Sequence, residues 1–259
     1  MPRFCANLSM MFNEVPFLDR FEAAAKAGFT AVEFLFPYEH PTAELRSRLQ
    51  ANGLTQALFN APPGNWAGGE RGTAALPGRE AEFREGVKQA LEYAHALDCP
   101  LVHCMAGIAP PGVAPATLAA RYAANIAWAA EQAEAAGVRL AIEPINHRDM
   151  PGYVLNTLAQ TAAVVTAVGA GRVGIQFDIY HCQVTEGDIT KRMEALMPLI
   201  AHMQIADVPA RNEPGTGEIG WDFVFRRIDA LGYRGWVGCE YRPAGDTVAG
   251  LAWRKNFNV

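Results

Sequence analysis

The chain alternates regularly between short apolar runs and helix-like segments, and this alternation constrains the fold more than any other feature of the sequence. The runs are rich in β-branched and aromatic residues, as buried strands are. Several helix-like segments end in glycine, which is typical of a helix C-terminus. We expect eight strands, over residues 4–10, 31–36, 54–60, 101–107, 140–145, 173–180, 202–206 and 236–241.

Repeated strand–helix units predict a parallel sheet that is covered by helices. Eight such units in roughly 250 residues match a closed (β/α)8 TIM barrel. An open, doubly wound sheet is less consistent, because neither a GxGxxG nor a GxxxxGKS/T pattern follows any predicted strand. No linker or low-complexity segment divides the chain. We therefore predict an α/β fold with a single TIM-barrel domain over residues 1–259.

Composition and charge argue against several kinds of partner. The formal net charge is -5 and Lys and Arg are nowhere clustered, which disfavours nucleic acid. The sequence shows no signal peptide core and no apolar run of membrane-spanning length. The 5 cysteines form no CxxC pair, which fits a reducing compartment. We expect a cytoplasmic protein with a small-molecule substrate and no membrane partner; exposed apolar helices would favour a homo-oligomer.

Two predicted loops are long, and both follow strands. Residues 61–78 follow the third strand and contain Trp66 and Arg71, and residues 207–220 follow the seventh. In a TIM barrel these loops lie on the C-terminal face, where active sites are built. We expect the first loop to cover the site as a lid.

Polar residues stand near the ends of four consecutive predicted strands: Glu143, Asp178, Gln204 and Glu240. They lie about one strand–helix unit apart, so we expect them at similar depth around one mouth of the barrel. Asp207 also stands at the end of the seventh strand, and we expect its oxygens to point toward the same mouth. One such carboxylate is as often structural as functional. Four polar residues at matched positions favour a functional site, because burying them without an ion or a substrate is costly.

Oxygen ligands of this kind suit a hard divalent cation, so we predict a Mg2+ or Mn2+ site formed by Glu143, Asp178, Gln204 and Glu240. Two glutamates on opposite sides of a substrate can take a proton from one carbon and return it to the next, while a metal polarises the carbonyl. This chemistry is isomerisation of an aldose, a ketose or an oxo acid. Glycoside hydrolysis, the other use of paired carboxylates, usually requires an aromatic-lined cleft.

A substrate carboxylate needs a cationic partner, and arginine is suited to it. Four arginines are expected on the same face: Arg71, Arg148, Arg211 and Arg242. His181 follows the sixth predicted strand, where a lone histidine is as often structural as functional, and His103 and His202 are expected to be core or supporting residues.

Segments along the whole chain resemble the hydroxypyruvate isomerase family of the xylose isomerase-like barrels, which includes the 2-oxo-tetronate isomerases. They are RFCANLSMMFNEVPFLDRF, AVEFLFPYE, LFNAPPGNWAGGERGTAALPGRE, IEPINHRDMPGY, QFDIYHCQ and WVGCEYRP. The resemblance implies that Glu143 and Glu240 are the catalytic acid/base pair and that the four oxygen ligands bind a metal. It also implies that His181 and Arg211 contact substrate oxygens. The implied reaction interconverts hydroxypyruvate and 2-hydroxy-3-oxopropanoate, or 2-oxo-tetronate and 3-oxo-tetronate.

The related ketose 3-epimerases carry histidine where this chain has Gln204. An amide oxygen is a weaker ligand than imidazole for most transition metals, so we expect a weakly held or dispensable metal. Three alternative functions stay open. Ketose 3-epimerisation would need no carboxylate-binding arginine, a metal-dependent endonuclease would need more histidine ligands and a basic groove, and a sugar-acid binding protein would need no acid/base pair.

Overall fold

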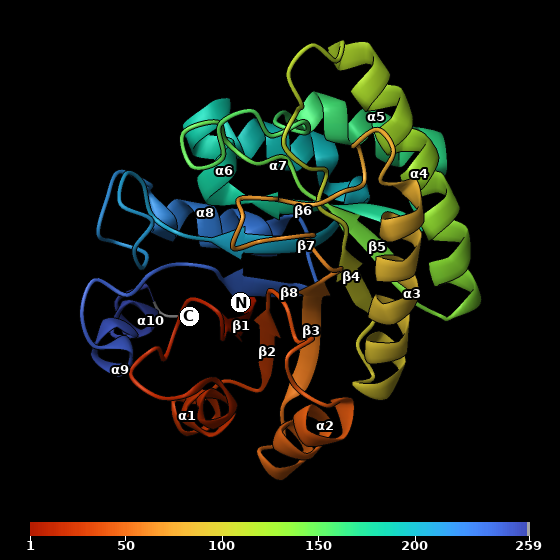
Figure 1. Cartoon of the computed structure of the whole chain (residues 1–259). Coiled ribbons are helices and arrows are strands. Elements are labelled where there is room, and N and C mark those ends of the chain that lie inside the picture. Colours follow the sequence, from red (N-terminus) through yellow and green to blue (C-terminus); the bar gives the residue numbers. More distant parts are fainter. Residues whose placement is uncertain (258–259) are drawn as a thin grey trace.

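The computed structural model describes residues 1–257 and forms a closed barrel of eight strands in chain order (Figure 1). Each strand pairs in parallel with its two neighbours, and β8 closes the barrel against β1. The predicted TIM barrel is confirmed. The strands are β1 (Arg3–Asn7), β2 (Ala31–Phe34), β3 (Thr55–Asn60), β4 (Leu101–His103), β5 (Arg139–Ile142), β6 (Val173–Asp178), β7 (Ile200–Ile205) and β8 (Trp236–Cys239).

Helices surround the strands (Figure 1), and the longer ones bury one face against the barrel. In α3 the buried residues are Phe83, Val87, Ala90 and Ala94, spaced three or four apart as an amphipathic helix requires. Among the described residues, no helix combines the length and the apolarity needed to cross a membrane. The helices are α1 (Arg20–Lys26), α2 (Thr42–Ala51), α3 (Glu80–Ala96), α4 (Pro115–Ala135), α5 (Leu158–Val168), α6 (Ile179–Thr185), α7 (Ile189–Leu196), α8 (Trp221–Ala230), α9 (Thr247–Gly250) and α10 (Trp253–Asn256), with 3-10 helices η1 (Phe17–Asp19) and η2 (Met197–Leu199).

Several strands end before the predicted boundary. The first, fourth and fifth predicted runs continue through Met10, Met105 and Ile145, which lie beyond the strands and line a cavity at the barrel mouth. Their apolarity therefore reflects the cavity wall and not strand pairing. The sixth strand was predicted to reach residue 180 but ends at Asp178, because the Asp178 carboxylate accepts a hydrogen bond of 2.8 Å from the Tyr180 N–H and caps α6.

The loop from β3 to α3 is fixed against the end of β4. A Cβ on Gly72 would lie 2.3 Å from the carbonyl oxygen of Met105, and Gly72 has a φ of +106°. Only glycine permits both this backbone conformation and this close approach. The loop also donates a backbone hydrogen bond of 2.9 Å from Ala75 to the Ala106 carbonyl. It forms a wall of the mouth, and its movement as a lid stays a prediction.

The loop from β7 to α8 is organised by one buried carboxylate, Asp207, which is 1% exposed. Its Oδ1 and Oδ2 accept hydrogen bonds from five donors, namely the N–H groups of Val208, Gly215, Gly217 and Ile219 and the indole Nε1 of Trp221. Both oxygens of Asp207 therefore hold the loop. The prediction that Asp207 directs its oxygens toward the barrel mouth is wrong, because the loop consumes its acceptor capacity.

Candidate active site

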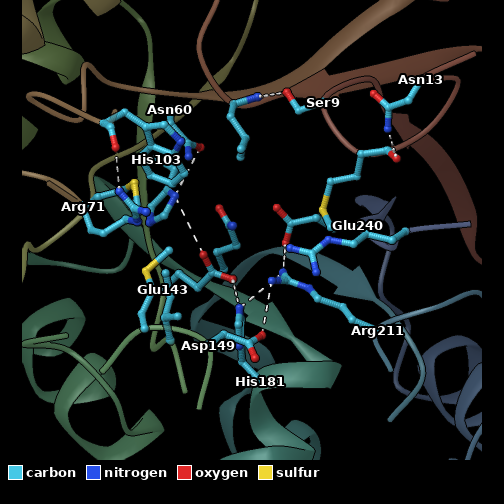
Figure 2. Close-up of a pocket in the computed structure, with 18 residues that line it drawn as sticks. Ser9, Asn13, Asn60, Arg71, His103, Glu143, Asp149, His181, Arg211 and Glu240 are labelled. Carbon is cyan, nitrogen blue, oxygen red and sulfur yellow. Dashed lines mark hydrogen bonds and ion pairs between the residues drawn. The ribbon is translucent and has the colours of Figure 1, made fainter. Parts of the chain in front are cut away.

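A cavity of about 550 Å³ opens at the C-terminal ends of the strands. Glu143 enters it directly after β5, Glu240 directly after β8, and His181 from the first turn of α6 (Figure 2). Arg71 and Arg211 also line it, on opposite sides (Figure 2). All five residues predicted to catalyse or to bind substrate therefore line one cavity, and each comes from a different loop or element end, as in TIM-barrel sites.

Three predicted carboxylates converge at this cavity. Glu143, Asp178 and Glu240 are 4%, 3% and 6% exposed, and together with His181 they place ligand atoms within 4.8 Å of one another. The strand register explains the convergence only in part, because Asp178 is level with Gln204, whereas Gln204 is level with Gly238, two residues before Glu240. Glu240 therefore lies two residues beyond the register partner of Gln204, a stagger that accompanies strand tilt in a closed barrel.

Arg211 provides the positive charge of the cluster. Its Nη2 lies 2.8 Å from Glu240 Oε2 and 3.4 Å from Asp178 Oδ2, and its Nη1 lies 3.6 Å from Asp149 Oδ2. Burial opposes protonation, but the charges of Glu240 and Asp178 raise the pKa of Arg211 above its usual value. The guanidinium therefore stays charged and offsets part of the repulsion among the carboxylates.

The carboxyl groups bind protons more tightly than usual. Burial raises the pKa of Glu143 well above its ordinary value, and Glu240 and Asp178 raise it further. Burial also raises the pKa of Asp178 to about 6 and that of Glu240 to about 8, although Arg211 opposes both shifts. Carboxyl groups that titrate near neutral pH are suited to general acid/base catalysis.

Hydrogen bonds determine which nitrogen of His181 carries the proton. The Asn146 Oδ1 accepts from the Asp149 N–H, so the Asn146 Nδ2 faces His181 Nδ1 and donates to it at 2.6 Å. The Asn146 backbone N–H also points to Nδ1, at 3.4 Å. Since both groups donate, Nδ1 accepts and Nε2 carries the hydrogen. Burial, and then the charge of Arg211, lower the pKa of His181 well below its usual value, so the ring is neutral. His181 thus presents an N–H donor to the site.

The amide of Gln204 is oriented in the same way by Glu33, a buried carboxylate inside the barrel. A carboxylate can only accept, so the Gln204 Nε2 that lies 2.8 Å from Glu33 Oε1 donates to it. The Gln204 Oε1 therefore faces away from Glu33 and accepts from Gln176 Nε2 at 2.7 Å. Gln204 itself does not line the cavity, whereas Gln176, to which its oxygen is bonded, does. The metal-ligand role of Gln204 stays a prediction.

The residues fit a hard divalent cation. Three carboxylates and one amide oxygen are the oxygen donors that Mg2+ and Mn2+ prefer. Within residues 1–257, the buried Oε1 of Glu143 lacks a hydrogen-bond partner, which a bound cation would supply. A second group, Cys5, Glu33 and His202, also lies close enough to hold an ion. There the Glu33 oxygens already accept from four neighbours, so its acceptor capacity is used within the barrel.

The arginines expected at the mouth differ in how they are engaged. Arg148 donates to the Tyr180 hydroxyl at 3.1 Å and to the Pro209 carbonyl. Arg71 lies 3.9 Å above the Trp66 ring and donates to two backbone carbonyls of its own loop. In the described part of the chain, no acidic side chain forms an ion pair with Arg71. Arg242 also lines the cavity and forms no ion pair within residues 1–257, but it is exposed, whereas Arg71 is partly buried with an uncompensated charge.

Sequence reasoning gave two residues too little weight. His103, expected to be a core or supporting residue, is buried and also lines the cavity, with Nδ1 3.2 Å from Asn60 Oδ1 and 3.9 Å from Glu143 Oε2. Burial, and then His202, lower its pKa to about 3, so the ring is neutral. Glu33 was not considered, although a glutamate in the middle of a predicted buried strand was a usable signal.

Comparisons with known proteins agree with this architecture. A model of the xylose isomerase-like TIM barrel family matches residues 21–257. The 2-oxo-tetronate isomerase of Cupriavidus necator is 57% identical over 257 residues, which cover 99% of each chain. The hydroxypyruvate isomerase of Escherichia coli is 47% identical over 253 residues, 98% of each chain. A crystal structure described as an AP endonuclease, family 2, from Brucella melitensis has a TM-score of 0.96 and 47% identity, covering 99% of each chain. The chain therefore belongs to the hydroxypyruvate isomerase and 2-oxo-tetronate isomerase family of xylose isomerase-like TIM barrels, and it is an isomerase of that type.

Proposed function

We propose that the protein moves a carbonyl group between neighbouring carbons of a small hydroxy-oxo acid, converting hydroxypyruvate to 2-hydroxy-3-oxopropanoate or 2-oxo-tetronate to 3-oxo-tetronate. The observation that carries this proposal is the pair Glu143 and Glu240. Both are buried at one cavity, and burial raises the pKa of Glu143 well above its ordinary value and the pKa of Glu240 to about 8. The names of the two curated relatives, at 57% and 47% identity, support the substrate class.

The two glutamates perform the proton transfers. One carboxylate takes a proton from the hydroxyl-bearing carbon, which gives an enediolate, and the other carboxyl group returns a proton to the adjacent carbon. The hydroxyl proton passes to the former carbonyl oxygen, so atoms and electrons balance within the substrate. The Nε2–H of His181, which lies within 3.9 Å of Glu143 Oε1, donates to a substrate oxygen and opposes charge build-up there.

We propose that Glu143, Asp178, Gln204 and Glu240 hold a Mg2+ or Mn2+ ion. When bound, such an ion would polarise the substrate carbonyl. Arg71 binds the substrate carboxylate, because its charge is uncompensated and lies across the cavity from Arg211 (Figure 2).

Direct assay tests the proposal. Purified protein is incubated with hydroxypyruvate and with 2-oxo-tetronate, with and without Mg2+, and the products are quantified by NMR. We expect turnover of at least one acid and a loss of roughly 100-fold or more in Glu143→Gln and Glu240→Gln. The exposed Glu218 provides the control variant Glu218→Gln, which keeps its activity. Turnover of neither acid would refute the proposal, and faster epimerisation of neutral ketoses would favour the 3-epimerase alternative.

The crystal structure described as an AP endonuclease gives a reason to test abasic-site DNA in the same preparation. The net charge of -5 supplies no general attraction for the phosphate backbone. Within the described residues, the candidate ligand cluster contains one histidine, and hydrogen bonding gives that histidine a donor role. We expect no cleavage above the rate of the Glu143→Gln variant.

A further inference from the structure

One nitrogen of Arg211 lies at the centre of the acidic cluster. Its Nη2 is 2.8 Å from Glu240 Oε2, 3.4 Å from Asp178 Oδ2 and 3.4 Å from His181 Nε2. Figure 2 shows this side chain reaching toward Glu240 and His181 from the wall of the cavity. The guanidinium therefore contacts two of the proposed metal ligands, Asp178 and Glu240, and the neighbouring His181 ring.

A guanidinium and a divalent cation cannot share this position. Mg2+ lies about 2.1 Å from its oxygen ligands. An ion at that distance from the Glu240 and Asp178 oxygens, which Nη2 approaches to 2.8 and 3.4 Å, would overlap the guanidinium nitrogen or meet its charge at close range. Two positive centres at such separation repel strongly in a buried site. One of them has to leave when the other binds.

The side chain of Arg211 can leave while its backbone stays in place. The backbone is held on both sides, by hydrogen bonds from Arg211 N to the Asp207 carbonyl at 2.9 Å and from Arg242 N to the Arg211 carbonyl at 2.8 Å. The stem is not held, because Nε has no hydrogen-bond partner among residues 1–257. Alternative partners already lie nearby, since Nη1 is 3.6 Å from Asp149 Oδ2 and the guanidinium carbon is 4.9 Å from the Tyr180 ring.

We propose that Arg211 is an exchangeable internal counter-ion: its guanidinium neutralises Asp178 and Glu240 when no metal is bound, withdraws toward Asp149 when a divalent cation enters, and is then free to contact the substrate. This inference rests on the proposed metal site. It gives a physical reason for weak metal binding, because the cation binds only the fraction of molecules in which the arginine has withdrawn. The same arginine stabilises the metal-free cluster, which would otherwise contain buried carboxylates without a cation.

Calorimetric titration with Mn2+ and with Mg2+ tests the exchange. In Arg211→Met the site needs no displacement, so we expect metal to bind about 10-fold to 100-fold more tightly than in the wild-type protein. The matched control is Arg148→Met, which removes a nearby charge that contacts Tyr180 and makes no ion pair with Asp178 or Glu240. Its affinity should stay within roughly 3-fold of wild type. Equal or weaker metal binding by Arg211→Met overturns the inference, as does the absence of metal binding to every variant.

A second measurement uses only folded wild-type protein, in case Arg211→Met does not fold. The Nε–H signal of Arg211 is followed by NMR during titration with diamagnetic Mg2+, and Arg211→Lys assigns the signal. We expect the signal to shift and to saturate together with the calorimetric binding curve. Metal binding without a shift of this signal overturns the inference. Turnover of the oxo acids in the same preparation reports separately on the proposed function. If the metal displaces Arg211 but neither acid is turned over, only the proposed function is refuted. If an acid is turned over but the metal does not displace Arg211, only the inference is refuted.

Discussion

Replacing Asp207 by asparagine should destabilise the protein strongly, because one carboxylate accepts five hydrogen bonds in the β7–α8 loop. Oδ1 accepts from two N–H groups and Oδ2 from three donors, including the Trp221 indole. Asparagine keeps one acceptor oxygen and replaces the other with an NH2 group, so at least the two donors on the Oδ1 side lose their acceptor. A buried donor without an acceptor costs about 1 to 3 kcal/mol, which predicts a loss of about 2 to 6 kcal/mol in the free energy of unfolding.

Urea unfolding of the wild-type protein, of Asp207→Asn and of a control measures this loss. The control is Asp222→Asn, whose side chain is 59% exposed and pairs with the exposed Arg226, so its loss should stay below roughly 0.5 kcal/mol. We expect a lower midpoint for Asp207→Asn with an unchanged slope. The same variant should also lose turnover, because the loop carries Arg211. A loss below about 1 kcal/mol would refute the reasoning that the five hydrogen bonds hold the loop.

Three further predictions follow from the site and its walls. Arg71→Met should lower kcat/KM for an oxo acid roughly 10-fold to 100-fold, mainly through KM, while leaving the midpoint of urea unfolding unchanged; an unaltered KM would exclude Arg71 as the carboxylate partner. Gly72→Ala should lower the melting temperature more than Gly69→Ala, because both glycines have positive φ but only at Gly72 would the new Cβ clash, 2.3 Å from the Met105 oxygen; equal melting temperatures would contradict this. In chelator-treated protein, stability should fall as pH rises from about 4.5 to about 8, because the folded state, in which the pKa of Glu240 is raised to about 8, keeps a proton that the unfolded state has released. Glu240→Gln should flatten this pH dependence in thermal melts, and an unchanged slope would show that Glu240 is not its source.

The barrel and its acidic mouth were predictable from the sequence, because both follow from the regular repeat of strand–helix units. Eight strand–helix repeats determine the topology. A residue at or just after the end of each strand reaches the same mouth, which is how Glu143, Asp178 and Glu240 were found. Strand ends were less predictable. An apolar residue that lines a cavity, such as Ile145, cannot be distinguished in the sequence from an apolar residue within a strand.

The roles of individual polar groups could not be read from the pattern. Asp207 and Asp178 both stand near the ends of strands, but one binds five loop donors and the other enters the acidic cluster, and only three-dimensional hydrogen bonding separates them. The tautomer of His181 likewise depends on how Asn146 is held by the Asp149 N–H. Which groups donate and which accept in the site thus depends on individual hydrogen bonds, and the periodic sequence pattern does not predict these bonds.

Glu33 and Gly238 have a consequence for how sequences of this family can diverge. A Cβ at position 238 would lie 2.4 Å from both carboxylate oxygens of Glu33, so the glutamate fits only where its neighbour has no side chain. Glu33 in turn holds the amide of Gln204 in the orientation in which its oxygen accepts from Gln176, a residue that lines the cavity. The two positions should therefore covary among relatives: glycine at 238 wherever 33 is glutamate, and a shorter residue at 33 wherever 238 acquires a side chain. A relative that has another residue at position 238 should also lose the hydrogen bond that orients residue 204. A substitution at position 238, inside the barrel, could therefore change the polar groups near the barrel mouth.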